Sequence, residues 1–204
     1  MEKSMGQRAA VIGGDKRAIY AARGLAERGI ECRLYGLEKD RWGNCNGFSH
    51  GSCFAPYLLS EALEGADIIL LPIPYTRDKK NLHTPLSGER IALDLLFSQI
   101  PKGSIIFGGG LPCEIEGCRI EDFLKSEEFA AANALPTAES AVALAMLHYE
   151  DLLYGSRCAV LGYGKIGQVL CRRLTALGGK VRVFARREES RRQAKLSGFE
   201  AHGF

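Results

Sequence analysis

The chain has 204 residues, which is enough for one or two domains. Its 27 basic and 24 acidic residues leave a net charge of +3, so we expect neither nucleic acid nor a membrane as a partner. No apolar run approaches 18 residues, and residues 1–8 lack the apolar core of a signal peptide. The seven cysteines include no C-x-x-C pair, which favours a cytoplasmic protein with reduced thiols. A zinc site built from Cys45, His50 and Cys53 matches no common ligand spacing, so we predict no metal centre.

The first part of the chain predicts strands that alternate with helices. Short apolar segments predict strands over residues 9–12, 31–35, 67–71, 104–107 and 129–133. Segments of helical periodicity lie between them, over residues 16–28, 56–64, 91–99 and 121–126. This alternation is typical of an α/β protein whose parallel sheet is covered on both faces.

A glycine pair follows the first predicted strand. Gly13 and Gly14 lack a third glycine at dinucleotide-binding spacing, and Arg17 comes directly after the turn. We expect an anion or carboxylate site in an interdomain cleft, with Arg17 in contact with the substrate. The alternative is that Arg17 is an exposed residue in the first turn of a helix.

A long helix is predicted over residues 135–153, where it links two domains. Pro136 and Thr137 resemble a helix start, with Thr137 as the N-cap and Ser140 three residues later. Free N–H groups at such a start favour an anionic substrate group, and plain helix capping is the alternative.

The strongest motif is the G-Y-G-K-I-G of residues 162–167. It follows a predicted strand over residues 157–161 and opens a helix, the context in which G-x-G-x-x-G binds a dinucleotide. Gly162 allows the tight turn, Gly164 the approach of the pyrophosphate, and Gly167 close packing of helix and strand. The other expected cofactor contacts of the motif are Tyr163, Lys165 and Ile166. The alternative is a glycine-rich turn without a ligand.

The residues after the next predicted strand, over residues 180–184, favour NADP over NAD. An NAD-preferring domain usually has an acidic residue here, whereas this chain has Ala185, Arg186 and Arg187. The small neutral residue removes repulsion, and the two arginines supply planar donors for a 2′-phosphate. The alternative is that both arginines simply begin a basic, solvated helix.

Three segments together resemble the family of dipicolinate synthase A subunits. They are V-I-G-G-D-K-R at residues 11–17, N-A-L-P-T-A-E-S-A at residues 133–141 and V-L-G-Y-G-K-I-G at residues 160–167. The resemblance implies a flavodoxin-like parallel-sheet domain over residues 1–134, a linking helix over 135–153 and the first half of a Rossmann domain over 154–204. It also implies a protein longer than this chain.

The resemblance further implies an enzyme that uses NADP to oxidise dihydrodipicolinate to pyridine-2,6-dicarboxylate in the mother cell of a sporulating bacterium. Its expected partners are further copies of itself and the flavoprotein-like B subunit of the synthase. Arg17, Thr137 and Ser140 are then candidate carboxylate holders. Glu139 is a candidate for proton removal or, alternatively, a first-turn helix acid.

Two other functions remain open on this architecture. One is a 2-hydroxyacid or alanine dehydrogenase-like oxidoreductase, and the other is a non-catalytic nucleotide-binding protein. No histidine has an obvious carboxylate partner in the sequence, so none is assigned as a general base. The four histidines are His50, His83, His148 and His202.

Overall fold

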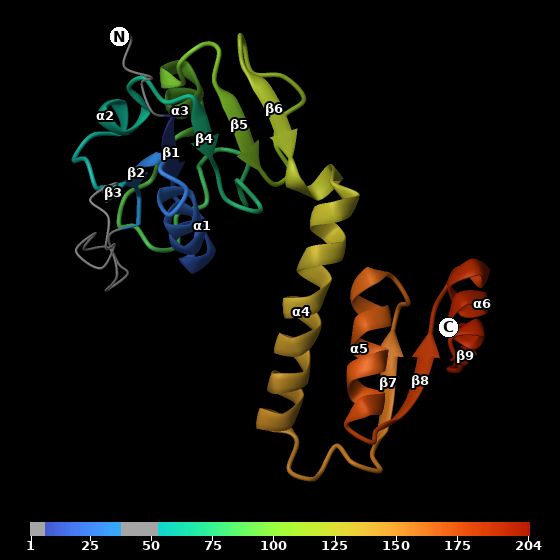
Figure 1. The fold of residues 1–204 in the computed structure, drawn as a ribbon. Coiled ribbons are helices and arrows are strands. Elements are labelled where there is room, and N and C mark those ends of the chain that lie inside the picture. The colour runs from blue at the N-terminus through green and yellow to red at the C-terminus, as the bar shows by residue number, and fades with distance from the viewer. Residues whose placement is uncertain (1–6, 38–52) are drawn as a thin grey trace. The chain divides into compact units, whose positions relative to one another are not determined.

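The computed structural model describes residues 7–37 and 53–204. The chain divides into two compact units, Met1–Lys125 and Ser126–Phe204 (Figure 1). Each unit contains its own parallel sheet, and we describe each by itself. The division places the long helix, which we expected as a linker between domains, inside the second unit.

The first unit is built on a six-stranded sheet in the order β3-β2-β1-β4-β5-β6, with all neighbouring strands parallel. Its strands are β1 (Arg8–Ile12), β2 (Glu31–Tyr35), β3 (Cys53–Phe54), β4 (Ile68–Leu70), β5 (Ile105–Gly108) and β6 (Arg119–Asp122). Without the two-residue β3, the order is that of flavodoxin-like sheets, as expected. With β3, it is the doubly wound order of dinucleotide-binding sheets.

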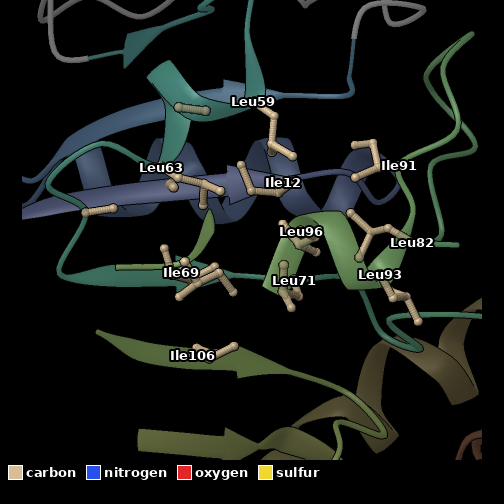
Figure 2. Close-up of a cluster of buried hydrophobic side chains, with 14 of the residues drawn as sticks. Ile12, Leu59, Leu63, Ile69, Leu71, Leu82, Ile91, Leu93, Leu96 and Ile106 are labelled. Atoms are coloured by element: carbon tan, nitrogen blue, oxygen red, sulfur yellow. The ribbon is translucent and has the colours of Figure 1, made fainter. Parts of the chain in front are cut away.

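Strand β1 lies at the centre of this sheet and is buried on both faces. Ala10 and Ile12 belong to the apolar cluster with α2 (Leu59–Leu63) and α3 (Leu93–Gln99), shown in Figure 2. The alternate residues Ala9 and Val11 belong to a second cluster, with α1 (Lys16–Ala26). This continuous burial explains why residues 9–12 are apolar at every position rather than at every second one.

The second unit has three parallel strands in the order β7-β8-β9, which is that of strands 1, 2 and 3 of a doubly wound sheet. Its elements are α4 (Glu127–His148), β7 (Arg157–Leu161), α5 (Lys165–Ala176), β8 (Lys180–Phe184), α6 (Glu188–Leu196) and β9 (Glu200–His202). Val160, Val183 and Ala201 share one apolar cluster with Cys171 and Leu174 of α5. The α/β fold class predicted from the sequence is confirmed in both units.

Two elements predicted from the sequence, over residues 121–126 and 129–133, differ from the structure. Residues 129–133 were expected as a strand, but they lie in α4, because their alanine-rich sequence favours helix. Residues 121–126 were expected as a helix, but residues 119–122 form β6 along β5, followed by a short 3-10 turn. The tertiary pairing with β5 decided this segment, since its polar residues carry little strand signal.

Helix α4 begins at Glu127, well ahead of the expected start at residue 135. Its N-cap is Ser126, whose hydroxyl accepts a hydrogen bond from the Phe129 N–H at 3.1 Å. Thr137 therefore lies inside the helix and donates its hydroxyl hydrogen to the Asn133 carbonyl at 2.7 Å. The expectation that Thr137 is an N-cap with free N–H groups behind it is wrong.

Helix α4 also has the length and apolar composition of a membrane span. It runs for 22 residues, and its most apolar window has a mean hydropathy of 1.2, although we expected no such segment. A single helix of this kind is weak evidence for a span, because helices of soluble proteins meet the same criteria. In this structure α4 packs along α5, and Ala134 and Ala138 are its buried residues.

The position of the helix start can be tested by two substitutions. We expect Ser126→Ala to lower the free energy of unfolding of the second unit by about 1 kcal/mol, because the Phe129 N–H loses its partner. We expect Thr137→Ala to change it by less than about 0.5 kcal/mol, since an interior helix position accepts alanine readily. Chemical denaturation followed by circular dichroism measures both. A larger loss of stability for Thr137→Ala than for Ser126→Ala would instead support a helix that starts near residue 135.

Candidate functional site: the glycine turn of the second unit

The turn between β7 and α5 is open on the side where a ligand would approach. Gly162 has a φ of +101°, and its N–H donates to the Phe184 carbonyl at 2.7 Å. A Cβ added at Gly162 or Gly164 would meet no other atom within 4 Å. The backbone conformation accounts for the glycine at 162, whereas nothing in the protein itself requires a glycine at 164.

Gly167 has a different role. A Cβ at this position would lie 2.3 Å from the Gly162 carbonyl oxygen, so only glycine lets α5 pack against the turn. Helix α5 begins at Lys165 after the N-cap Gly164, which provides no side-chain hydrogen bond. Its first N–H groups thus remain available at the open turn, and they favour a phosphate there.

A pocket of about 670 Å³ joins this turn to the end of β8. Its lining residues are Leu161, Gly162, Tyr163, Gly164, Ala185, Arg186, Arg187, Ser190 and Phe204. The pocket therefore brings together most of the cofactor residues that the motif and the following strand predict, although Lys165, Ile166 and Gly167 do not line it. Ser190 was missed, because a serine in a charged helix carries no sequence signal of its own.

The arginines at the pocket are free to bind an anion. Within the described part of the chain, neither the Arg186 nor the Arg187 side chain has a hydrogen bond or an ion pair. Arg191 instead holds the loop, because its Nη1 donates to the carbonyls of Ala185 at 2.9 Å and Arg186 at 2.5 Å. The loop thus presents two uncompensated guanidinium groups beside a small, buried Ala185.

The three variable residues of the motif serve different contacts. The Tyr163 ring is buried edge-on against Phe199, and its hydroxyl has no hydrogen-bond partner among the described residues. Lys165 forms an ion pair with Glu127 at the start of α4. Ile166 is 43% exposed. The orphaned hydroxyl, the open glycines and the free arginines all fit a dinucleotide bound at this turn.

The glycine pair of the first unit is closed by contrast. The N–H of Gly13 donates to the Tyr35 carbonyl at 2.7 Å, and that of Gly14 donates to the His83 carbonyl at 2.9 Å. A Cβ at Gly13 would lie 2.8 Å from the Thr84 side chain. These glycines therefore allow the loop of residues 82–84 to pack against the turn, and their N–H groups are not available for an anion.

Arg17 lies beside this closed turn and is paired with Asp15. Its Nη2 donates to Asp15 at 2.8 Å and to the Ile73 carbonyl at 2.9 Å, while its Nε bonds Asp15 as well. The hydrogen bonds from Arg17 hold the pKa of the Asp15 carboxyl below its usual value. Asp15 also caps α1 by accepting from the Arg17 N–H.

The candidate substrate residues of α4 lie in the helix interior. Thr137 is half-buried, Ser140 is exposed, and the N–H groups of this stretch donate within the helix. Glu139 accepts a hydrogen bond from Arg173 Nη2 of α5 at 2.9 Å in an exposed ion pair. Any contact of Thr137 and Ser140 with a substrate therefore depends on their hydroxyl groups alone.

The buried cysteines Cys32 and Cys171 lack the signature of a reactive thiol. Burial raises the pKa of Cys32 to about 12 and that of Cys171 to about 11, which disfavours the thiolate. No group of three potential metal ligands occurs among residues 7–37 and 53–204. Cys45 and His50, which we considered for a zinc site, lie outside these residues.

The strand order and the open glycine turn of the second unit define a Rossmann-type nucleotide-binding fold. The family model of the N-terminal domain of the dipicolinate synthase A subunit matches residues 8–122. The chain therefore belongs to the family of dipicolinate synthase A subunits, as the sequence motifs predicted.

Three relatives show the extent of this likeness. The dipicolinate synthase A subunit of Bacillus subtilis (strain 168) is 29% identical over 189 residues, which are 89% of this chain and 61% of that protein. The crystal structure of the same component of dipicolinate synthase from Bacillus subtilis has a TM-score of 0.72 at 26% identity and covers 98% of this chain and 67% of its own. The A-subunit structure from Bacillus halodurans has a TM-score of 0.75 at 24% identity, and the match covers 97% of this chain and 68% of that structure's chain. This chain thus spans about three fifths of the curated relative.

The fold extends beyond the family. A transhydrogenase structure from Sinorhizobium meliloti has a TM-score of 0.58 at 13% identity and covers 96% of this chain and 61% of its own. At this identity the likeness concerns the fold alone. It agrees with a doubly wound parallel architecture for both sheets.

Proposed function

We propose that this chain is part of an oxidoreductase that uses NADP to oxidise dihydrodipicolinate to pyridine-2,6-dicarboxylate. The observation that carries the proposal is the open turn of residues 162–167, whose pocket also contains the free Arg186 and Arg187. The membership of the family of dipicolinate synthase A subunits supports the choice of substrate.

In this proposal the second unit holds the cofactor. The N–H groups at the start of α5 bind the pyrophosphate, and Gly164 leaves room for its approach. Arg186, Arg187 and the Ser190 hydroxyl bind the 2′-phosphate, which NAD lacks. When bound, the nicotinamide supplies the acceptor for a hydride.

The chain's other task is to hold the substrate. Aromatisation of the dihydropyridine ring removes a hydride from one ring carbon and a proton from a neighbouring atom, while both carboxylates must be held in place. We propose Arg17 of the first unit and, taken separately, the Ser140 hydroxyl of α4 as donors to substrate carboxylates. Thr137 can join them only as a donor whose hydroxyl hydrogen leaves the Asn133 carbonyl. We assign Glu139 to the pairing of α4 with α5 through Arg173 rather than to proton removal.

The location and the partners of the whole enzyme are also proposals. We infer that it acts in the cytoplasm of the mother cell of a sporulating bacterium, as a homo-oligomer and together with the flavoprotein-like B subunit. These inferences rest on the family and not on a feature of the described residues.

Calorimetric titration of the chain with NADP and NAD tests the cofactor. We expect NADP to bind at least about tenfold more tightly, because two arginines face the added phosphate. Addition of NADP and dihydrodipicolinate to the whole enzyme of which this chain is a part, followed by the absorbance of the reduced nicotinamide, tests the reaction. No binding of either dinucleotide would overturn the proposal. Turnover only with 2-hydroxy or 2-amino acids would replace the substrate, and binding without turnover of any of them would indicate a non-catalytic nucleotide-binding protein.

A further inference from the structure

The sheet of the first unit has a topological switch point between β1 and β4. Strand β1 connects through α1 to β2 on one side of it, whereas β4 connects to β5 on the other. Open α/β sheets bind ligands outside the carboxyl ends of two such strands. Here the two ends meet, because Arg17 after β1 donates to the carbonyl of Ile73 after β4 at 2.9 Å.

The loop after β4 folds back over this point. Its ends are joined by an antiparallel bridge between Thr76 and Leu82, and the His83 N–H donates to the Tyr75 carbonyl at 2.7 Å. The His83 carbonyl accepts the N–H of Gly14. The loop thereby brings the side chains of His83 and Arg77 near the turn that carries Asp15 and Arg17, and these groups interact electrostatically.

Some polar groups at this point have no partner. Arg17 and Asp15 neutralise one another through three side-chain hydrogen bonds. Arg77 makes no ion pair, and the His83 ring makes no hydrogen bond, with any residue that the structure describes. Nη1 of Arg17 is likewise unbonded within residues 7–37 and 53–204. One full positive charge, one imidazole and one guanidinium nitrogen thus remain for a ligand.

We propose that Arg77 and His83, together with Nη1 of Arg17, form a carboxylate-binding site at the switch point, where the chain segments after β1 and β4 meet. The choice of a pyridine dicarboxylate as the ligand rests on the proposed function. The side chains must supply the donors, because the N–H groups of Gly13 and Gly14 are bonded within the protein. Arg77 supplies the charge, and His83 donates from one ring nitrogen.

This site couples binding to a proton. Burial, followed by the charge of Arg77, holds the pKa of free His83 below its usual value, although Asp15 acts in the opposite direction and Arg17 adds to the lowering. A bound carboxylate favours the imidazolium and raises that pKa. The complex then takes up a proton, so affinity increases as the pH falls through the pKa of the bound form and is weaker above it.

The 204-residue chain can be titrated with pyridine-2,6-dicarboxylate by calorimetry at pH values from about 6 to about 8, which span the usual range of histidine titration. We expect Arg77→Ala to weaken binding about tenfold through the loss of a charge-assisted hydrogen bond. We expect His83→Gln to bind the probe with an affinity that no longer changes with pH. Arg28→Ala is the matched control, because it removes an exposed arginine beyond the far end of α1. It should bind as the unsubstituted chain does.

The His83 resonance gives an independent readout. We expect its NMR titration midpoint to rise on addition of the probe, with His202 of the second unit unchanged. An unshifted midpoint, no binding of the probe, or equal affinities for Arg77→Ala and Arg28→Ala would overturn the site. None of these measurements requires NADP. A failure of NADP binding therefore contradicts the proposed function and leaves this site standing.

Discussion

Simultaneous replacement of Arg186 and Arg187 by alanine is expected to weaken NADP binding by about a hundredfold and to leave NAD binding nearly unchanged. Both side chains line the pocket at the glycine turn without a partner among the described residues, so their charges are available to a 2′-phosphate. Each charge-assisted hydrogen bond is worth about 1.5–3 kcal/mol, and the loss of two exceeds a factor of about 100. Calorimetric titration with each dinucleotide measures the two affinities.

The control for this experiment has the same change in net charge. Arg192 on α6 pairs with Glu189 at 3.5 Å, and Arg157 is exposed at the start of β7. The double variant Arg157→Ala with Arg192→Ala should retain NADP binding, apart from a small effect of long-range charge. Equal losses in both double variants would mean that the arginines act only through net charge, and the assignment of a 2′-phosphate site would be wrong.

Replacement of Gly167 by alanine is expected to destabilise the second unit strongly. The new Cβ would lie 2.3 Å from the Gly162 carbonyl oxygen, a backbone atom that no side-chain rotation can move away. Helix α5 must then shift from β7, and overpacking of this kind costs about 1–3 kcal/mol or more. Differential scanning calorimetry should show a lower Tm for the second unit, together with loss of NADP binding.

Gly164→Ala provides the matched comparison. Its Cβ would meet no atom within 4 Å, and its φ is −81°, which any residue adopts. We expect the Tm to change little, since surface substitutions usually lie within about 0.5 kcal/mol, while NADP binding falls because the methyl group occupies the path of the pyrophosphate. Stability lost at Gly164 and retained at Gly167 would reverse the assigned roles of the two glycines.

Local patterns are sufficient to predict several strands of both units, although they do not predict β3, β6 or β9. Residues 31–35, 157–161 and 180–184 form strands with the expected bounds. Each is a short segment rich in β-branched or apolar residues and is bounded by glycine or a turn. The parallel α/β class followed from their alternation with helices.

The sequence predicts the start of α4 wrongly, because a proline followed by threonine resembles a helix boundary. Pro136 lies inside the helix and removes the N–H that would bond the Ala132 carbonyl. Ala132 is exposed, so water can hydrate that carbonyl and the helix continues. The proline ring also clashes with that carbonyl, and the packing of α4 along α5 through the buried Ala134 and Ala138 helps to offset this cost.

The two glycine turns show which features the local sequence determines and which depend on the tertiary structure. The glycine spacing, together with the strand before it and the helix after it, predicts the turn at residues 162–167, and Ala185 and Arg186 in the same local unit favour NADP over NAD. The N–H groups of the turn at Gly13 are closed to a ligand by Tyr35 and by the loop that carries His83. These segments are distant in sequence and meet the turn only in the folded sheet. The physical reason is that a free backbone N–H is defined by every segment that packs against it, and no local motif contains those segments.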